Sequence, residues 1–362
     1  MSIRLELGLD TFGDVTTGHD GNPLPHAEVI RHVIDEAVLA DDLGIDFFGV
    51  GEHHRADFAV SSPEVLLAAI AGRTKRIRLG SAVTVLSSDD PIRVFQRFAT
   101  LDAVSNGRAE VILGRGSFTE SFPLFGFNLS DYEKLFEEKL DLFAALIQQE
   151  PVTWQGTTRP PLANQRVFPP VETGHLTTWI GVGGSPESVV RAARYDMPLM
   201  LAIIGELMLA IIGGEPSRFG PYVDLYRRAY EHLGKPVRPI GVHSPGYIAE
   251  SDEQAREELW PDYKRMRDRI GAERGWPPMQ RAEFDREAAV GSLYVGSPET
   301  VARRIVSTAR VLGISRFDMK YSAGALSHEK IMRCISLYGS KVIPLVRELL
   351  KDEASAAPEV PT

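Results

Sequence analysis

The sequence is nearly free of cysteine: Cys334 is the single one among 362 residues. One cysteine excludes an intrachain disulfide and any metal site built from several thiolates. Such a chain fits a reducing compartment, and we expect a cytoplasmic protein.

The sequence also lacks an excess of basic residues and a long uninterrupted apolar run. Its 40 Lys and Arg stand against 49 Asp and Glu, a formal net charge of −9, which disfavours a large basic surface for nucleic acid. The longest apolar stretch, Met197–Gly213, contains Pro198, Gly205 and Glu206, and a charge in its middle disfavours a membrane span. The N-terminal residues enter a strand-like pattern without the apolar core of a signal peptide. We therefore expect neither nucleic acid nor a membrane as a partner.

What the sequence does contain is a regular alternation of short apolar runs with amphipathic stretches. Runs rich in Val, Ile, Leu and Phe are typical of strands buried on both faces of a parallel sheet. Eight β–α alternations predict an α/β fold, for which we prefer a closed (β/α)8 TIM barrel with insertions to an open doubly wound sheet. The eight expected strands are Arg4–Leu9, Asp46–Val50, Ile77–Leu86, Ala109–Leu113, Thr178–Val182, Pro198–Ile204, Ile240–Ala249 and Ser315–Lys320.

The segments between these strands are predicted to be helices that form one domain over residues 1–351. Insertions are expected near residues 151–176, which are rich in Pro, and 251–292, which are highly charged. Residues 352–362 are rich in Ala, Glu and Pro and are expected to form a disordered tail. The predicted helices include Ala27–Leu43, Ser185–Arg194, Arg218–Leu233, Ser297–Leu312 and His328–Lys351.

One internal repeat is exact: LMLAIIG occurs at residues 199–205 and again at 207–213. Because the offset of eight residues is even, either copy fits the sixth strand without turning its side chains to the other face. The sequence alone does not decide which copy forms the strand.

Polar residues follow the second expected strand, at Glu52, His53 and His54. In parallel α/β folds, functional residues collect at the carboxyl ends of the strands. If the chain stays extended here, successive side chains alternate in direction, so that only one of the two histidines points into the barrel. We interpret that histidine as a catalytic or ligand-contacting group, since its pKa is near neutral; a hydrogen-bonded structural histidine is the alternative. Neither H-x-H nor H-E-x-x-H spacing occurs, and no metal site is predicted.

Two further strand ends suit a phosphate group. After the fourth expected strand, Arg115 lies between Gly114 and Gly116, and a guanidinium beside backbone amides suits an anion. After the fifth, Gly183–Ser185 forms a turn that enters a helix. This turn favours a single phosphate, because it is neither G-x-G-x-x-G nor a P-loop. A solvated arginine and a plain helix cap are the alternatives. The third expected strand contains small residues in Leu79–Leu86, which fit either close approach of a flat ligand or ordinary barrel packing.

Together, in their order and spacing, these motifs resemble the bacterial luciferase-like flavin-dependent monooxygenase family. The resemblance extends from about Leu5 to Leu349. It is carried by Glu52–His54, Gly80–Leu86, Asp90–Arg93, Asp102–Arg108, Gly114–Gly116 and Gly183–Ser185.

The resemblance implies FMN, or in some branches a deazaflavin coenzyme, across the carboxyl-end mouth of a barrel that is often dimeric. It implies that His53 is the active-site histidine, flanked by Glu52, and that the Ala82–Val83 peptide bond is cis. Gly114 departs from the pattern, since the light-emitting enzyme has a cysteine there, and light emission is not expected. The implied cofactor contacts are Ser81, Ala82, Val83, Thr84, Arg115, Gly116, Gly183, Gly184 and Ser185.

We therefore expect a flavin-dependent oxidoreductase, specifically a monooxygenase that uses reduced FMN and O₂ on a small organic substrate. No NAD(P)H motif is visible, which favours a separate flavin reductase as the source of reduced cofactor, and we expect a homodimer. One alternative on the same barrel is a deazaflavin-dependent hydride transferase. A non-catalytic flavin-binding barrel is another, disfavoured by the presence of Glu52–His54. A metal-dependent hydrolase barrel lacks the ligand spacing it would need.

Overall fold

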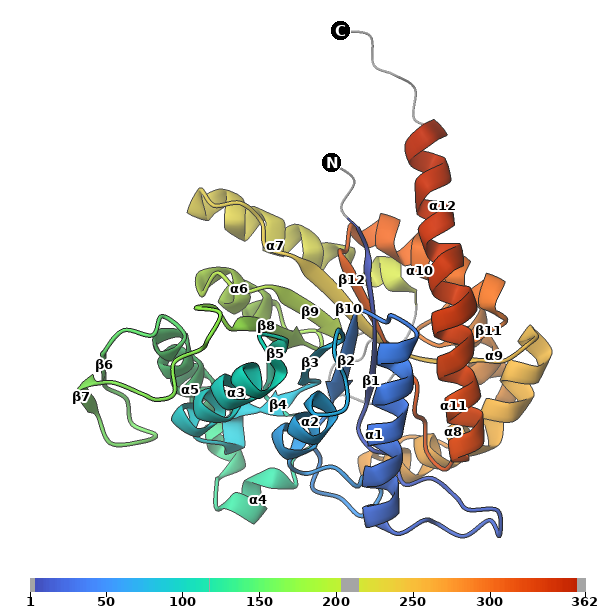
Figure 1. Cartoon of the computed structure of the whole chain (residues 1–362), viewed down its shortest axis with the longest axis horizontal. Helices are drawn as coiled ribbons and strands as arrows, with labels where there is room; N and C mark the ends of the chain where they lie inside the picture. Colours follow the sequence, from blue (N-terminus) through green and yellow to red (C-terminus); the bar gives the residue numbers. More distant parts are fainter. Residues whose placement is uncertain (1–3, 117, 203–214, 357–362) are drawn as a thin grey trace, which may run out of the picture.

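Eight parallel strands close into a barrel in this computed structural model, which describes residues 4–116, 118–202 and 215–356 (Figure 1). Around the barrel each strand pairs with the next, and the circle closes through the pairings of β10 with β9 and with β12. The predicted (β/α)8 barrel is therefore confirmed over the open sheet. The strands are, in order around the barrel, β1 (Glu6–Thr11), β2 (Phe47–Val50), β3 (Arg78–Ser81), β5 (Ala109–Gly114), β8 (Thr177–Val182), β9 (Leu199–Ala202), β10 (Ile240–Ile248) and β12 (Arg316–Lys320).

A layer of apolar and charged side chains fills the interior of the barrel. Arg316 is fully buried, and its guanidinium lies 3.6 Å from the ring centroid of Phe47. Arg316 Nη1 donates to Glu110 Oε2 at 2.6 Å, and Arg316 Nε donates to Asp318 Oδ2 at 2.9 Å. A buried charge needs such partners, because burial removes its hydration. This layer fills the barrel interior and makes it a packed core.

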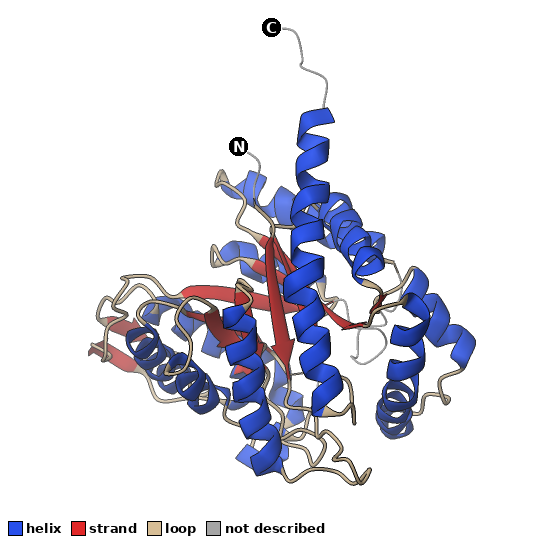
Figure 2. Ribbon diagram, turned by 45° about the vertical axis from the view of Figure 1, so that its right-hand side comes forward, coloured by secondary structure: helices blue, strands red, loops and turns tan. Residues whose placement is uncertain are grey.

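Helices surround the barrel, as Figure 2 shows. Several begin where the sequence places a capping residue before proline: the Asp90 side chain accepts from the Ile92 amide, and the Ser297 side chain from the Thr300 amide. The last helix continues to Ala356, further than predicted, into the expected tail. The surrounding helices are α1 (His26–Asp42), α2 (Pro63–Ala71), α3 (Pro91–Ser105), α4 (Ser121–Phe125), α5 (Tyr132–Leu146), α6 (Pro186–Arg194), α7 (Gly220–Leu233), α10 (Pro298–Leu312), α11 (His328–Leu337) and α12 (Ile343–Ala356).

Two insertions interrupt the alternation in the expected regions. The first contains an antiparallel pair, β6 (Val152–Trp154) and β7 (Leu162–Gln165), set apart from the barrel. The second contains α8 (Asp252–Arg274) and α9 (Arg281–Ala289). It is followed by β11 (Tyr294–Gly296), a short strand absent from the prediction that pairs in parallel with the carboxyl end of β10.

The prediction of one continuous third strand over Ile77–Leu86 is wrong. The strand β3 stops at Ser81, and a separate short strand, β4 (Thr84–Val85), pairs with the end of β5. Between them the Ala82–Val83 peptide bond is cis, as the family resemblance implied. The break lies at the mouth of the barrel, where the Ala82 amide still donates to the Val50 carbonyl of β2 at 2.9 Å.

The first copy of the LMLAIIG repeat supplies the sixth barrel strand, β9. The second copy, residues 207–213, lies outside the described residues. No helix within residues 4–116, 118–202 and 215–356 has both the length and the apolar character that crossing a membrane requires.

Candidate active site

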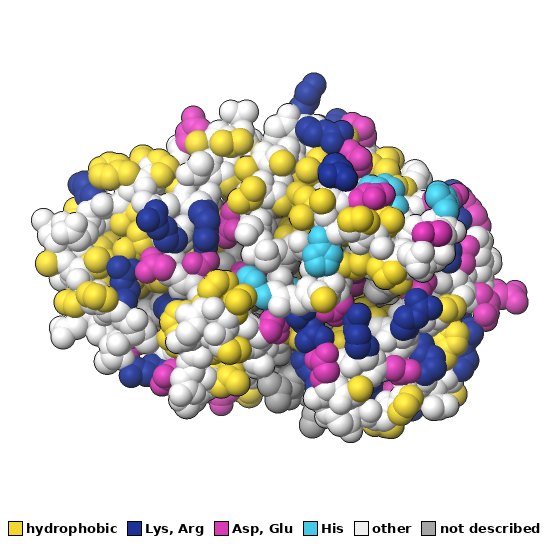
Figure 3. Space-filling view, turned by 90° about the horizontal axis from the view of Figure 1, so that it is seen from below, with side chains coloured by type: hydrophobic (Ala, Val, Ile, Leu, Met, Phe, Trp, Pro, Cys, Tyr) yellow, Lys and Arg dark blue, Asp and Glu magenta, His cyan; other side chains and the backbone are white. Residues whose placement is uncertain are grey.

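A cavity of about 380 Å³ opens at the carboxyl ends of the barrel strands. Figure 3 looks onto this end of the molecule, over which apolar, acidic and basic side chains are mixed, with histidines near the centre. Most of the predicted site residues meet in the cavity wall. Ser81 and Thr84 are not among the lining residues; both are fully buried, and Ser81 Oγ bonds the backbone of Ile112. The predicted residues that line the cavity are Glu52, His53, Ala82, Val83, Arg115, Gly116, Gly183, Gly184 and Ser185.

One side of the cavity has the features of an anion site. Arg115 projects there from the end of β5, with its guanidinium 5.4 Å from the ring centroid of Tyr132 and an ion pair to Glu133. The turn Gly183–Ser185 leads into α6, where the Ser185 hydroxyl accepts from the Ser188 amide. Gly184 has φ +130°, a conformation that side chains disfavour. A cation beside a helix N-terminus attracts negative charge, so this side can hold a phosphate group.

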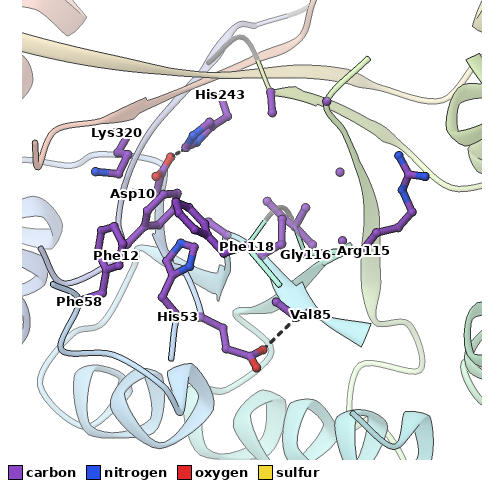
Figure 4. A pocket seen from close by; sticks show the side chains of 18 of the residues that line it. Asp10, Phe12, His53, Phe58, Val85, Arg115, Gly116, Phe118, His243 and Lys320 are labelled. Carbon is purple, nitrogen blue, oxygen red and sulfur yellow. Dashed lines mark hydrogen bonds and ion pairs between the residues drawn. The ribbon is translucent and has the colours of Figure 1, made fainter. Parts of the chain in front are cut away.

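His53 lies in an aromatic cluster on the opposite side of the cavity, as Figure 4 shows. Its ring centroid is 4.6 Å from that of Phe12, 4.5 Å from that of Phe58 and 5.0 Å from that of Phe118. Its Nδ1 is 3.8 Å from Glu120 Oε1. Burial raises the pKa of Glu120, but His53 and backbone amides outweigh this effect, and the pKa is lowered overall. His53 is thus a largely enclosed imidazole with a carboxylate beside it.

The expectation that only one of the two adjacent histidines reaches the cavity is wrong, because both line it. The strand β2 ends at Val50, so the alternation of an extended chain no longer applies at His53 and His54. His54 Nε2 donates to Glu52 Oε1 at 2.9 Å, and Glu52 Oε2 accepts from the Val85 amide at 2.9 Å. This hydrogen bond raises the pKa of His54. Glu52 therefore ties the loop after β2 to the segment that follows the cis peptide bond.

The inner end of the cavity contains polar residues that the sequence reasoning missed. Asp10 lies near the carboxyl end of β1, and His243 lies within β10. Their side chains meet, with 2.6 Å between His243 Nδ1 and Asp10 Oδ2. Lys320, at the end of β12, donates to Asp14 Oδ2 at 2.9 Å. Asp10 and Lys320 sit at strand ends, so the rule that found Glu52 would have found them, whereas nothing marks a histidine inside a strand.

Asp318 also lines this end of the cavity and is paired with Arg316. Burial raises the pKa of Asp318 to about 6, although the Arg316 charge acts in the opposite direction. Gly8 on β1 leaves the space for this carboxyl group, since a Cβ there would lie 2.1 Å from Asp318 Oδ1. Among the described residues, no group of three or more His, Cys, Asp or Glu side chains is arranged to hold a metal ion.

The rest of the cavity wall suits a flat apolar ring. Ala82 and Val83 line it beside Ile112 and Met200, which belong to a small buried apolar cluster inside the barrel. Gly114 is required here, because a Cβ at this position would lie 2.5 Å from Val83 Cγ2. A ring against this apolar wall with a phosphate near Arg115 matches the two ends of a flavin mononucleotide. The residues present therefore fit a phosphorylated flavin.

Comparisons with known proteins agree with this chemistry. A family model described as luciferase-like monooxygenase matches residues 11–316. The chain is 30% identical to 4-hydroxyprotoasukamycin monooxygenase of Streptomyces nodosus subsp. asukaensis over 70% of this chain and 69% of that protein. It is 24% identical to the alkanal monooxygenase alpha chain of Photobacterium leiognathi over 89% of this chain and 95% of that protein.

Solved structures share the fold at low sequence identity. The monooxygenase RslO1 from Streptomyces bottropensis superposes with a TM-score of 0.79 at 23% identity, over 94% of this chain and 99% of that chain. An oxygenating constituent of 3,6-diketocamphane monooxygenase from Pseudomonas putida, in complex with FMN, superposes with a TM-score of 0.72 at 18% identity, over 94% and 98% of the two chains. An F420-dependent secondary alcohol dehydrogenase superposes with a TM-score of 0.73 at 16% identity, over 95% and 99%.

Proposed function

Because the chain belongs to the luciferase-like monooxygenase family, and is thereby a flavin-dependent oxidoreductase, we propose that it is a monooxygenase. In this proposal it uses reduced FMN and O₂ to oxygenate a small organic substrate. The observation that carries the proposal is the two-ended cavity, with Arg115 and the Gly183–Ser185 turn on one side and an apolar wall at Ala82–Val83. These two ends match the phosphate and the ring system of a single cofactor.

Each end of the site has its own task in binding. Arg115 and the N-terminus of α6 hold the phosphate by charge and backbone dipole. Ala82, Val83 and Gly114 shape the wall on which the ring system lies, since Gly114 leaves room for Val83. Reduced flavin supplies the electrons that activate O₂, and the protein supplies placement and exclusion of water.

His53 is the residue that we assign to proton transfer. It lines the cavity, and three phenylalanine rings enclose it. Glu120 Oε1 lies 3.8 Å from its Nδ1, so a carboxylate stands beside the ring. Held in this way, His53 can donate a proton to, or accept one from, a group at the flavin edge or on the substrate.

A binding titration tests the cofactor assignment. Purified protein is titrated without oxygen with reduced FMN, oxidised FMN and riboflavin, and binding is followed by fluorescence. We expect saturable binding of FMN and much weaker binding of riboflavin, which lacks the phosphate. Addition of air to the reduced complex should consume O₂, and a screen of candidate substrates should then yield an oxygenated product. If FMN and riboflavin bind equally, or neither binds, the assignment of the phosphate site is wrong.

A deazaflavin coenzyme is the second candidate, supported by the similarity to the F420-dependent dehydrogenase. On this barrel it would carry a hydride and need no O₂. The same titration separates the two functions: binding of the deazaflavin coenzyme alone, with no O₂ consumption, favours hydride transfer.

The proposal includes a homodimer in the cytoplasm that receives reduced flavin from a separate reductase. Exposed apolar side chains support an interface, among them Val65, Leu124, Phe125 and Leu129. Sedimentation equilibrium measures the assembly directly. Steady-state turnover with NADH, with and without an added flavin reductase, tests the need for a separate reductase. Full turnover without the reductase would contradict that need.

A further inference from the structure

We propose that His243, oriented by Asp10, accepts the proton of a phenolic hydroxyl on the substrate at the inner end of the cavity. The inference rests on the proposed monooxygenase function, which it deepens by naming the substrate class. It depends on two residues that the family resemblance did not indicate.

The two side chains form a carboxylate–imidazole pair across the barrel. Asp10 lies on β1 and His243 on β10, the two strands that flank β12. Asp10 is fully buried and His243 is 7% exposed, and 2.6 Å separates Asp10 Oδ2 from His243 Nδ1. An ionised carboxylate only accepts hydrogen bonds, so Nδ1 carries the hydrogen. The lone pair of the neutral imidazole is then on Nε2.

Nε2 is the atom left for a ligand. His243 Nε2 and Asp10 Oδ1 are both buried and have no hydrogen-bond partner in the part of the chain that the structure describes. Both residues line the cavity, and Figure 4 shows their side chains joined at its inner end. Buried polar atoms in native proteins are almost always paired, so two unpaired acceptors at one end of a cavity indicate a ligand that donates a hydrogen bond.

The surrounding charges exclude an acidic ligand group at this end. On β12, Asp318 is occupied by Arg316, and Lys320 is occupied by Asp14 and Ser322. On β5, Glu110 also binds Arg316. The two cations at this end, Arg316 and Lys320, are therefore already paired with carboxylates. Among the described residues, none is left there to bind a ligand carboxylate or phosphate. A neutral hydroxyl that donates a hydrogen bond meets no such repulsion.

Part of the wall near this pair is apolar, and the Phe12 ring lies between His243 and His53. The Phe12 ring centroid is 6.1 Å from that of His243, with the rings nearly parallel, and 4.6 Å from that of His53. Met200 and Ile112 complete the wall. The body of the ligand is thus apolar, and a ring that stacks beside Phe12 places its hydroxyl at His243.

Acidity decides between an alcohol and a phenol. A phenol, with a pKa of about 10, is acidic enough for an imidazole to take its proton as a general base while the reaction proceeds. An aliphatic alcohol is far less acidic and would only hydrogen-bond. In the step, the O–H bond of the phenol breaks, the N–H bond at His243 Nε2 forms, and the electron pair stays on the phenolate oxygen. The resulting phenolate ring is richer in electrons and more readily oxygenated.

Matched small probes test the inference. Binding of para-cresol and para-methylanisole, which differ only in the hydroxyl hydrogen and its methyl replacement, is measured by calorimetry on the FMN-loaded and flavin-free protein. We expect the phenol to bind at least about ten-fold more tightly than the anisole to the wild type, because only the phenol donates to Nε2. His243→Phe should abolish this preference, and His232→Phe, at an exposed position of α7 outside the cavity, should retain it. Equal binding of the two probes to the wild type, or binding of neither, overturns the inference.

A second measurement uses only the wild-type protein, so it does not depend on whether His243→Phe folds. In wild-type protein labelled with ¹⁵N-histidine, NMR should show the tautomer with hydrogen on Nδ1 at His243 and also at His328, whose Nδ1 lies 3.0 Å from Glu36 Oε1. The Nε2 resonance of one of these two histidines should shift on addition of para-cresol but not of para-methylanisole, and absence of such a shift contradicts the proposal. FMN binding is recorded in parallel. FMN binding without phenol preference refutes the inference alone, whereas phenol preference without flavin binding refutes the proposed function.

Discussion

Glu52 and His54 form a hydrogen-bonded pair, with 2.9 Å between Glu52 Oε1 and His54 Nε2. The second oxygen of the same carboxylate accepts from the Val85 amide at 2.9 Å. One side chain thus connects the loop after β2 to the segment that shapes the apolar wall of the cavity. Its role is to position the wall, while His53 beside it faces the aromatic cluster.

Replacing Glu52 with Gln should lower the pKa of His54. The carboxylate hydrogen bond is the main cause of the raised pKa, and a neutral amide does not stabilise the imidazolium. A raised folded-state pKa stabilises the fold below the unfolded pKa of about 6.5, and this contribution is lost as pH rises through the folded pKa. The melting-temperature deficit of Glu52→Gln should therefore be larger near about pH 6 than near about pH 9.

Histidine NMR titration measures the pKa of His54 directly. The exposed Glu250, which pairs with Lys341, provides the control, and Glu250→Gln should leave His54 unchanged. A His54 titration curve that is the same in Glu52→Gln and wild type would contradict this account.

His53→Ala should bind flavin but lose most turnover. Its ring is enclosed by Phe12, Phe58 and Phe118, on the side of the cavity opposite Arg115. Loss of a general acid or base typically costs about 10²–10⁴-fold in rate. The measurement is kcat with a substrate from the screen, beside an FMN titration on the same preparation. Full turnover in the variant would remove His53 from the mechanism.

Arg115→Ala should weaken FMN binding by about ten-fold or more while leaving riboflavin binding nearly unchanged, since only FMN carries the phosphate. Arg115 is ion-paired with Glu133, so an FMN phosphate would compete with that carboxylate for the guanidinium. Glu133→Gln is the matched variant and should strengthen FMN binding. Equal losses of FMN and riboflavin in Arg115→Ala would mean that Arg115 does not contact the phosphate.

Gly114→Ala should destabilise the protein by about 1–3 kcal/mol through overpacking. The new Cβ would lie 2.5 Å from Val83 Cγ2, and Val83 sits in the cavity wall. Urea unfolding measures the loss, and FMN affinity should fall with it. The double variant Gly114→Ala with Val83→Ala removes the clash and should recover part of the stability. If stability does not recover, the close approach of these two residues is not the cause of the destabilisation.

Much of this protein can be predicted from local patterns. The apolar runs were long enough and frequent enough to place all eight barrel strands, because strands buried on both faces need continuous apolar sequence. The glycine-flanked Arg115 and the Gly183–Ser185 turn were found because they follow such runs, where parallel strands end. Each of these inferences depends on residues that are neighbours in the chain.

Where the pattern depended on backbone geometry, the sequence was less informative. No residue in the apolar run Ile77–Leu86 indicates that the strand is interrupted. The strand β3 nevertheless stops at Ser81, before the cis peptide bond. Likewise, the alternation rule assigned one histidine to the cavity, and both reach it, since β2 ends at Val50.

The sequence by itself determined the barrel, its helices and the residue types at the strand ends, because periodicity and capping are local. Only the tertiary structure decided which of those residues meet. Asp10 and His243 are separated by 233 positions and lie on the two strands that flank β12. Their pairing follows from closure of the barrel, which places β10 two strands from β1. No local pattern carries that information, because strand order around a closed sheet is a property of the whole chain.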